Sequence, residues 1–381
     1  MRIAILVRNF NRNMGGAERY CVELSERLSE DNEVHVYSQN FDGRSTKIEF
    51  HKISKYFDKP RFLNQLLFSY LTKKATSGKF DIIHSHEMVS NADIYTIHVP
   101  CFKSDWINSR GIRKFLKSIN TLLSPRKIGY LWLEKKQMKY NPKKHFISVS
   151  EYLSRNIEQC YPSITNISVA HPGISEKFIQ NESNNNGQLQ SLKEELSIPE
   201  SSFIILLVAN NYQKKGLSTT LKALEILKKH NIYLVIAGKG EQKKTNIPKS
   251  ISNNIYFLGA INNMANLYCQ VDLLIHPTLA DTFGMAPLEA MSFKLPVIIS
   301  NMKYCGFSEH INDTQALILD DPKDETELAN KIDFLYENIE DRNRIAQNGF
   351  ELSKKITWDN TLHQTLLAYN LINHSLKVKA K

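Results

Sequence analysis

Cysteine is scarce in this 381-residue chain, and long apolar stretches are missing from it. The five cysteines are scattered, odd in number and without a Cys-x-x-Cys pair. This pattern indicates a reducing compartment and neither a disulfide framework nor a zinc site. No run of about 18 apolar residues occurs, so a transmembrane helix is not expected. An uninterrupted apolar run of only five residues precedes Arg8, which is typical of a buried first strand and not of a signal peptide.

The residues that are present fit a soluble globular protein with two domains. Apolar residues make up 42% of the chain and charged residues 23%, which is ordinary for soluble domains. The length suits two domains of roughly 150–200 residues, because a single core rarely grows larger. No repeat with a period of about 20–50 residues is visible, which excludes a solenoid.

Apolar strand-like runs alternate with helical patterns along the whole chain. Repeated βα units predict parallel sheets covered by helices on both faces, that is, doubly wound α/β domains. In the first half, helical patterns near 16–29, 62–77 and 150–159 separate strands predicted at 2–8, 33–38, 47–53, 81–85, 93–97 and 145–149. In the second half, strands are predicted at 203–209, 232–237, 255–258, 273–275, 296–299 and 316–319.

A polar run, Asn181–Gly187, lies between the two series of strands and indicates a loop near a domain boundary. We therefore predict an amino-terminal domain over 1–180 and a carboxy-terminal domain over 181–354. Charged helices are predicted from 324 to 353. A terminal helix that begins near Trp358 is expected to pack back on the first domain, so that 355–381 belong with it.

The net charge of +10 is concentrated in one segment. Between Cys101 and His145 the chain has twelve Lys and Arg and two acidic residues, an excess that equals the whole net charge. Apolar residues from Ile112 to Leu123 fall at helical spacing between these cations. A basic amphipathic stretch with Trp and Tyr predicts an anionic membrane surface as the partner of 102–144. The alternative is a helix that packs its apolar stripe on the core. Nucleic acid is not expected, because no recognition motif accompanies the charge.

The segment Asp281–Glu289 carries the strongest functional signal. It follows the apolar strand Asp272–Pro277 and places two carboxylates where the carboxyl end of a strand meets the start of a helix. Ligands of open α/β sheets bind at such places. Carboxylates accept hydrogen bonds from sugar hydroxyls, and a helix amino terminus binds phosphate. The alternative is an ordinary helix start, with Asp281 as the N-cap and Pro287 in the first turns.

This segment resembles the Glu-x7-Glu motif of retaining glycosyltransferases of the GT-B fold, the family 4 group that includes sucrose synthase and lipopolysaccharide and mannosyl transferases. The resemblance implies two Rossmann-like domains that face a cleft. The first acidic position is Asp281 and not the usual Glu, which shortens the reach toward the donor hexose. The resemblance implies that Glu289 binds the donor ribose, and that Asp281 with the backbone of Phe283, Gly284 and Met285 holds the hexose.

Further donor-site candidates follow other strands of the second half. Lys214 and Lys215 lie at a strand-to-helix turn, where cations and helix N–H groups can meet a pyrophosphate. The family has an Arg at the position of Lys214, so the charge is kept and the bidentate geometry is lost. Gly238 resembles a family glycine turn. Leu258 lies in a segment whose backbone, in the family, contacts the nucleobase.

The first half supplies candidates of its own. Gly15 and Gly16 follow the first strand and let a backbone approach a phosphate or sugar closely. In the family, His98 lies near the sugar's C6 hydroxyl and helps to position the donor. His86 is a further candidate for acceptor contact, and Ser150 is either part of a family motif or a helix cap.

The resemblance implies retaining transfer from a UDP-sugar, with Asp281, His98 and Lys215 at the reaction centre. No cofactor and no metal are expected, because fixed cations take the metal's place beside the leaving diphosphate. The acidic run 320–324 is interpreted as capping and solvation and not as a metal site. Within the family the chain most resembles lipopolysaccharide-core glucosyltransferases, particularly at Cys305–Gly306.

Acceptor, donor sugar and oligomeric state are not determined by these patterns. A glycan or glycolipid acceptor at the cytoplasmic face of the inner membrane fits the basic segment. The chain would then be cytoplasmic and peripheral on that membrane. Capsule, exopolysaccharide or protein glycosylation are alternatives. A nucleotide-sugar epimerase of the same fold is another, and it would act without an acceptor.

Overall fold

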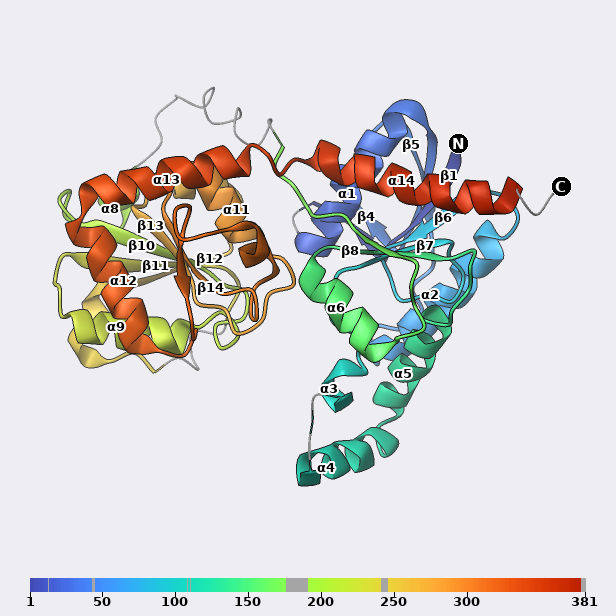
Figure 1. Cartoon of the computed structure of the whole chain (residues 1–381), viewed down its shortest axis with the longest axis horizontal. Coiled ribbons are helices and arrows are strands. Elements are labelled where there is room, and N and C mark those ends of the chain that lie inside the picture. Colours follow the sequence, from blue (N-terminus) through green and yellow to red (C-terminus); the bar gives the residue numbers. More distant parts are fainter. Residues whose placement is uncertain are drawn as a thin grey trace. The chain divides into compact units, whose positions relative to one another are not determined.

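The computed structural model describes residues 1–12, 14–42, 45–107, 109, 111–175, 191–240 and 246–377. The chain divides into two compact units: unit 1 comprises Met1–Pro172 and Trp358–Lys381, and unit 2 comprises Gly173–Thr357 (Figure 1). The loop predicted at 181–187, and with it the predicted boundary at 180/181, lies outside the described residues. Among the described residues, no helix combines the length and the apolar character needed to cross a membrane.

Unit 1 is built on a seven-stranded parallel sheet with the order β5-β3-β1-β6-β7-β8-β9. Six of its strands were predicted, and the short β9 and a two-stranded β2-β4 pair were not. The bounds are β1 Arg2–Leu6, β2 Asn9–Phe10, β3 Glu33–Ser38, β4 Asn40–Phe41, β5 Ile48–Lys52, β6 Ile82–Ser85, β7 Ile94–Ile97, β8 His145–Ser148 and β9 Ile167–Val169.

Two helices of unit 1 begin at a serine whose side chain caps the first turn, Ser124 before α5 and Ser150 before α6. The Ser150 side chain caps α6 by accepting a hydrogen bond from the Leu153 N–H, which confirms its predicted capping role. In α14 the side chains of Trp358 and Tyr369 are buried within unit 1. The bounds are α1 Gly16–Asp31, α2 Arg61–Thr76, α3 Ser104–Ile107, α4 Gly111–Leu122, α5 Pro125–Gln137, α6 Glu151–Cys160 and α14 Trp358–Lys377.

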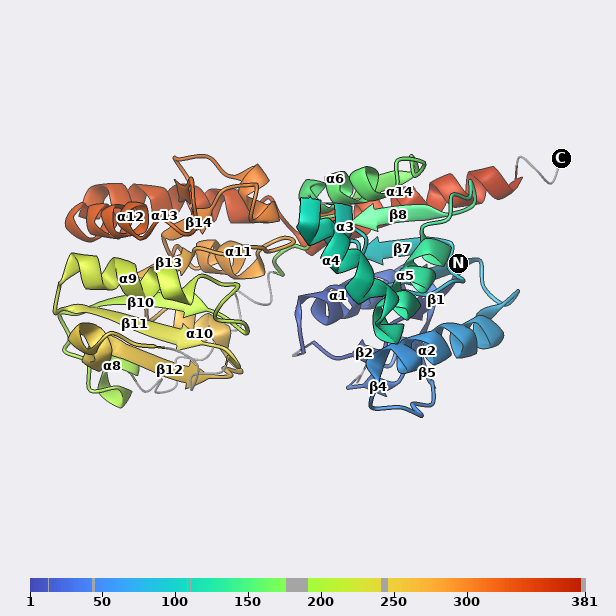
Figure 2. The ribbon, with the colours of Figure 1, turned by 90° about the horizontal axis from the view of Figure 1, so that it is seen from below.

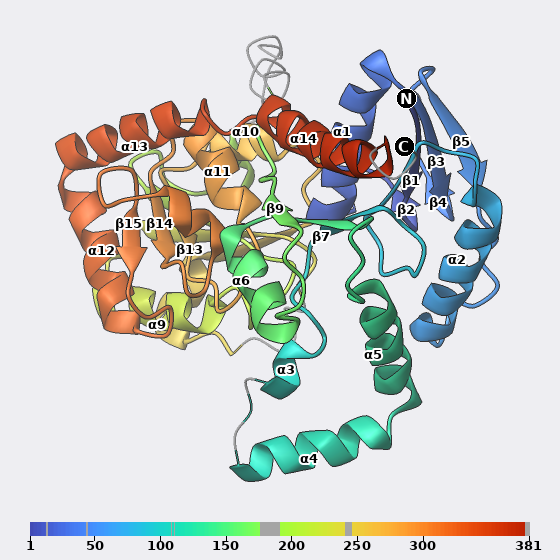
Figure 3. The ribbon, with the colours of Figure 1, turned by 45° about the vertical axis from the view of Figure 1, so that its right-hand side comes forward.

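Helix α4 extends away from the sheet of unit 1, beyond α3 and α5 (Figure 3). The helix was predicted from its amphipathic spacing, and its existence is confirmed. Three of its apolar side chains are exposed and do not pack on the core: Ile112 is 79% exposed, Phe115 is 65% exposed and Ile119 is 40% exposed. Trp132 of α5 is also exposed. The alternative of an apolar stripe buried on the domain core is therefore wrong for these side chains.

Unit 2 contains a six-stranded parallel sheet with the order β12-β11-β10-β13-β14-β15, and all six of its strands were predicted. Strands β10, β11 and β12 run side by side in the same direction (Figure 2). The bounds are β10 Phe203–Val208, β11 Ile232–Ala237, β12 Ile255–Gly259, β13 Leu273–His276, β14 Val297–Ser300 and β15 Leu317–Leu319.

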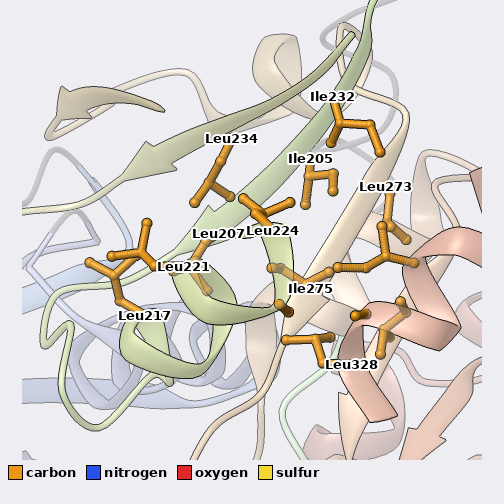
Figure 4. Packing of buried hydrophobic residues seen from close by; sticks show 14 of the residues in the cluster. Ile205, Leu207, Leu217, Leu221, Leu224, Ile232, Leu234, Leu273, Ile275 and Leu328 are labelled. Carbon is orange, nitrogen blue, oxygen red and sulfur yellow. The ribbon is translucent and has the colours of Figure 1, made fainter. Parts of the chain in front are cut away.

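The central strands of the unit 2 sheet are buried on both faces, which fits their apolar runs. Ile205 and Leu207 of β10 point into a core shared with α9 and α12 (Figure 4). Ile204 and Leu206 point to the opposite core, which α10 and α11 cover. The helices are α8 Leu192–Glu195, α9 Leu217–Leu227, η2 Lys249–Asn254, α10 Met264–Tyr268, α11 Met285–Ser292, η3 Gly306–His310, α12 Glu325–Glu337 and α13 Ile339–Ser353.

The strand orders fix where each unit can bind a ligand. In unit 2 the chain runs from β10 to one side of the sheet and then from β13 to the other, so the order reverses between these two neighbours. In unit 1 the same reversal occurs between β1 and β6. Open α/β sheets bind ligands outside the carboxyl ends of the strands at such a switch point. The loops after β10 and β13, and those after β1 and β6, are therefore the candidate positions.

Candidate functional site

The turn after β10 presents two lysines at the switch point of unit 2. The backbone N–H of Lys214 donates to Asn211 Oδ1 at 2.9 Å, and its carbonyl accepts from the Leu279 N–H at 2.8 Å. The second bond holds this turn against the loop that follows β13. The Lys214 side chain is exposed, whereas Lys215 is half-buried. The two predicted cations thus share a turn but differ in surroundings.

Gly216 ends this turn in a conformation that requires glycine. Its φ is +77°, in the left-handed region, where side chains are disfavoured. A Cβ built there would lie 2.0 Å from the Pro277 carbonyl oxygen. Helix α9 begins at the next residue, and no side chain caps its first turn among the described residues. The glycine therefore lets the amino terminus of α9 approach the β13 loop directly.

Asp281 is the polar centre of the β13 loop. Its carboxylate forms an ion pair with Lys215, and its Oδ2 also accepts from His276 Nε2 at 3.0 Å. Burial alone would raise the pKa of Asp281, but the Lys215 ammonium and the His276 hydrogen bond outweigh it and hold that pKa well below its usual value. The N-cap alternative for Asp281 is wrong, because the N-cap position of α11 is occupied by Gly284, three residues later.

His276, the last residue of β13, completes this pair and was not predicted. Its ring is 1% exposed. Burial, reinforced by the nearby Lys215 charge, lowers the pKa of His276, so a neutral ring donates its Nε2–H to Asp281. The only sequence signal was a histidine at a strand end five residues before the motif. A terminal strand histidine has many structural roles, so that signal was weak.

The peptide segment after Asp281 is held in one shape by the loop after β14. The Phe283 carbonyl accepts from the Phe307 N–H at 2.5 Å and from the Cys305 thiol at 3.2 Å. Gly284 has φ +109°, and a Cβ there would lie 2.7 Å from Cys305 Sγ. Helix α11 begins at Met285 without a side-chain cap among the described residues. A second helix amino terminus therefore faces the switch point.

Glu289 lies in α11 and is only 7% exposed. Its Oε2 accepts a hydrogen bond from the Tyr268 hydroxyl at 2.9 Å. Tyr268 ends α10 and is almost fully buried. It was not predicted, because it lies far from Glu289 in the sequence and has no motif of its own. A buried carboxylate fixed by a tyrosine is a preorganised acceptor for hydroxyl groups.

Two further predicted positions lie at the neighbouring strand ends. The Gly238 N–H donates to the Gly259 carbonyl at 2.6 Å, and the Lys239 N–H donates to Asn210 Oδ1 at 2.9 Å. These bonds join the turn after β11 to the end of β12 and to the turn after β10. Leu258 is half-buried in β12. All predicted donor-site residues of unit 2 therefore lie at or near the carboxyl edge of its sheet.

In unit 1 the predicted residues follow β1, β6 and β7. Gly15 precedes α1 in an extended conformation, and a Cβ at Gly16 would meet no other atom within 4 Å. The space around position 16 would therefore accommodate a side chain, and does not by itself require a glycine there. The Asn13 that precedes this pair lies outside the described residues.

His84, His86 and His98 form a stack at the ends of β6 and β7. Ring centroids are 4.6 Å apart for His84 and His86 and 5.3 Å apart for His86 and His98. His86 Nδ1 lies 3.0 Å from His98 Nε2, and His84 Nδ1 lies 2.8 Å from the Tyr369 hydroxyl. Burial lowers the pKa of His84 and of His98 to about 3. At neutral pH His98 is therefore an uncharged hydrogen-bonding group.

These histidines predict that acid destabilises unit 1. Their folded pKa values lie below the ordinary value of about 6.5, so below that pH the unfolded chain binds protons that the folded unit does not. Stability is expected to be constant above about pH 6.5 and to fall toward pH 3, by up to about 1.4 kcal/mol per pH unit for each ring. Thermal melting from pH 8 to pH 5 measures the slope. His98→Gln should reduce it, and the exposed His230→Gln should not. A melting temperature that stays flat across this range contradicts the assignment.

The acidic run before α12 behaves as predicted where it caps that helix. Asp324 Oδ1 accepts from the N–H groups of Thr326 and Glu327, each at 2.9 Å. This bonding confirms the capping interpretation for Asp324. Asp320 and Asp321 contribute backbone N–H groups that donate to Glu327.

Two sequence profiles match the chain. One is described as Glycosyl transferases group 1 and covers residues 190–352, and the other as Glycosyltransferase Family 4 and covers 14–178. Among curated proteins, the lipopolysaccharide glucosyltransferase WaaG of Escherichia coli K12 is 28% identical over 30% of this chain and 32% of its own length. The alpha-monoglucosyldiacylglycerol synthase of Acholeplasma laidlawii is 30% identical over 33% of this chain and 34% of its own length.

Solved structures give a longer match at lower identity. A crystal structure of WaaG superposes with a TM-score of 0.76 at 17% identity and covers 97% of this chain and 99% of its own. HepE of Anabaena, solved in complex with UDP, has a TM-score of 0.68 at 16% identity and covers 97% of this chain and 100% of its own. By sequence, the chain spans only 32–48% of the length of the curated relatives that lead the comparison.

The two parallel sheets and these structural matches show the GT-B fold, which confirms the predicted fold. Within that fold, the two profiles cover most of the described residues between them, and both describe glycosyltransferases. The chain is therefore a glycosyltransferase whose residues 190–352 match the group 1 family.

Proposed function

We propose that this chain transfers a hexose from a UDP-sugar, with retention at the anomeric carbon, to a membrane-associated glycan or glycolipid such as lipopolysaccharide core. The observation that carries the donor half is the Lys215–Asp281–His276 cluster at the switch point of unit 2, together with the buried Glu289. The cluster provides cations, two helix amino termini and fixed carboxylates, which are the groups that a nucleotide sugar requires. The UDP bound in the similar HepE structure supports the choice of nucleotide.

Each group has a distinct chemical task in this proposal. Negative charge grows on the leaving diphosphate, and Lys215, the exposed Lys214 and the amino terminus of α9 would stabilise it. Asp281 keeps Lys215 in position and would accept a hydrogen bond from a hydroxyl of the hexose. Glu289, held by the Tyr268 hydroxyl, would accept hydrogen bonds from the ribose hydroxyls. His98 would bind a sugar hydroxyl as a neutral ring.

Slow hydrolysis of the donor tests this proposal without knowledge of the acceptor. The purified chain is incubated with UDP-, GDP- and ADP-sugars, and nucleotide release is measured. We expect UDP release from one UDP-sugar, lost in Glu289→Ala. Analysis of the released sugar by NMR distinguishes retention from inversion. Conversion of the donor into an epimer without UDP release would identify an epimerase instead. An absence of turnover for every donor, with no thermal stabilisation by any nucleotide, would contradict the proposal.

Metal removal is expected to leave transfer unchanged. In this proposal Lys215 and the two helix starts take the role of a divalent ion in neutralising the diphosphate. Nucleotide release measured in excess EDTA should therefore equal release in its absence, within about twofold. Activity that disappears in EDTA and returns only with a divalent ion would show that the lysines do not suffice.

The acceptor half of the proposal depends on the surface of α4 and α5. Ile112, Phe115 and Trp132 are exposed on helices that lie within the most basic part of the chain. An exposed aromatic and aliphatic surface among cations suits an anionic lipid surface. Two similar proteins are named for glycolipids, a lipopolysaccharide glucosyltransferase and an alpha-monoglucosyldiacylglycerol synthase. We infer a peripheral position on the cytoplasmic face of the inner membrane.

Vesicle sedimentation tests this membrane contact. The chain should bind vesicles that contain anionic lipid, bind neutral vesicles more weakly, and dissociate as salt rises. The double variant Ile112→Ser/Phe115→Ser removes exposed apolar area, and we expect at least a tenfold loss of partitioning. Ile339→Ser removes a comparable side chain, 59% exposed, from unit 2 and serves as the matched control. Equal binding by all three proteins would place the contact elsewhere and remove this support for a membrane acceptor.

A further inference from the structure

The edge of the unit 1 sheet places four histidine and glutamate side chains on one face. Strand β5 is the edge strand, and within the described part of the chain it pairs with β3 alone (Figure 3). In the parallel register His35 lies opposite Glu49, and Tyr37 lies opposite His51. Because side chains alternate along a strand, Glu33, His35, Glu49 and His51 all project to the same side.

Three of these side chains converge on one point. His35 Nδ1 lies 2.9 Å from His51 Nε2 and 3.4 Å from Glu49 Oε2, and His51 Nε2 lies 3.3 Å from Glu49 Oε1. A tetrahedral Zn²⁺ with bonds of about 2.0–2.1 Å holds neighbouring ligand atoms about 3.3–3.4 Å apart. The three atoms therefore need only small shifts to surround a single ion. Among the described residues they form one of two clusters whose ligand atoms lie this close together.

The fourth side chain sets the tautomer that a metal needs. His35 Nε2 lies 2.8 Å from Glu33 Oε1, and Glu33 is itself paired with Arg2 at 3.0 Å. A carboxylate only accepts hydrogen bonds when ionised, so the His35 proton resides on Nε2 and a lone pair points from Nδ1 toward the cluster. A histidine that donates its second N–H to a carboxylate is the usual arrangement around protein-bound zinc.

The surroundings make the cluster rigid on one side and open on the other. His35 is 4% exposed and packs edge-on against Phe80, with ring centroids 5.0 Å apart. His51 stacks on Tyr37 at 4.5 Å. The Glu49 side chain is 63% exposed, so an ion can enter from solvent. Two imidazoles and a carboxylate suit Zn²⁺ and related first-row ions better than Mg²⁺ or Ca²⁺.

The geometry points to a zinc site in unit 1, with His35 Nδ1, His51 Nε2 and the Glu49 carboxylate as ligands and water in the fourth position. Glu33 is a positioning residue that orients His35. The ion would join the edge strand β5 to β3. It would stabilise the folded unit, because an ion that binds only the folded state shifts the folding equilibrium. The ligands lie on strands, away from the switch point between β1 and β6, so the role is structural and independent of the proposed function.

Zinc titration of the full chain, freed of metal by EDTA and dialysed, tests this site. Calorimetry should show about one equivalent of Zn²⁺ bound, and thermal melting should show a higher melting temperature with Zn²⁺ but not with Mg²⁺. Glu49→Gln and His51→Gln should each weaken binding at least tenfold and abolish the thermal shift. Co²⁺ in place of Zn²⁺ should give the visible absorption of a tetrahedral ion, and this spectrum should be lost in the same variants.

Two controls separate this site from adventitious binding. The exposed His230→Gln in unit 2 should bind Zn²⁺ like the unmodified chain. Glu49 is exposed, so its substitution is not expected to impair folding, and an unchanged melting temperature without metal verifies this. Failure to bind Zn²⁺ would show that His35 and His51 form only a hydrogen-bonded pair. Binding that survives both Glu49→Gln and His51→Gln would place the ion elsewhere. Either result overturns the assignment.

Discussion

Lys215→Ala is expected to lower donor turnover by about 10³-fold, the largest loss that we predict for a single cation. Lys215 is the cation that Asp281 fixes at the start of α9, so its ammonium need not reorganise when charge develops on the leaving diphosphate. The measurement is the rate of UDP release at saturating donor. The exposed neighbour Lys214→Ala is the matched control, and we expect a loss of only about tenfold there, because surface charges are screened.

Lys215→Ala also leaves the Asp281 carboxylate without its cation. The resulting loss of stability can be measured separately from the loss of catalysis. Asp281 would keep only the His276 hydrogen bond, and we expect a destabilisation of about 2 kcal/mol because the carboxylate is mostly buried. Adding Asp281→Asn to Lys215→Ala removes the unpaired charge. This double variant should recover stability but not activity. Recovery of both would mean that Lys215 acts only as a structural partner of Asp281.

Glu289→Gln is expected to reduce kcat/KM for the UDP-sugar by about 10³-fold. The carboxylate is buried and fixed by Tyr268, so a neutral amide would lose charge-assisted bonds to two ribose hydroxyls, each worth about 1.5–3 kcal/mol. The direct comparison uses a donor whose ribose lacks its 2′-hydroxyl. The unmodified enzyme should discriminate against this donor strongly, and the variant should not.

Tyr268→Phe is the matched control for Glu289. It keeps the buried ring and removes only the hydroxyl that orients the carboxylate. We expect a loss of about tenfold or less, mainly in KM, because the acceptor oxygens remain. Full activity of Glu289→Gln, or discrimination that persists in it, would show that Glu289 does not contact the ribose.

The fold was largely predictable because its signals are local. In unit 2 each strand contains a continuous apolar run, and the central strands β10 and β13 are buried on both faces, so these strands can be recognised without knowledge of their tertiary neighbours. The missed strand β9 has only three residues, and all of them are half-buried. Nothing in its sequence separates it from a loop. Cys21, Cys101, Cys160 and Cys305 are buried free thiols, and Cys269 is an exposed one, as the lack of spacing indicated.

Candidate site residues could be predicted where a motif lies in one segment, and not where a partner comes from a distant segment. Lys215, Asp281 and Glu289 were predicted because each lies in a continuous strand-to-helix segment, and the structure brings the Lys215 and Asp281 side chains into contact. His276 and Tyr268 are defined by the atoms that they contact, and their contacts depend on how β13 and α10 pack. The Asp281 N-cap alternative failed because three residues, the last of them the left-handed Gly284, intervene before α11 begins.

Packing of the basic segment was also beyond sequence patterns. Periodicity places Ile112 and Phe115 on one helical face, but it does not reveal whether a core meets that face. In unit 1 it does not, and both side chains remain exposed. The His35–Glu49–His51 cluster shows the same limit. Cysteine spacing gave no sign of zinc, and the histidines come together only through the register of β3 and β5.

Direct titration of UDP into the full chain tests the central claim, that unit 2 binds the donor nucleotide through Lys215, Asp281 and Glu289. Calorimetry with UDP, GDP and ADP, repeated with Lys215→Ala and Glu289→Gln, needs neither acceptor nor turnover. We predict one UDP per chain, weaker binding of the other nucleotides, and at least a tenfold loss of affinity in each variant. Binding that is absent, or that both variants retain in full, would contradict the account.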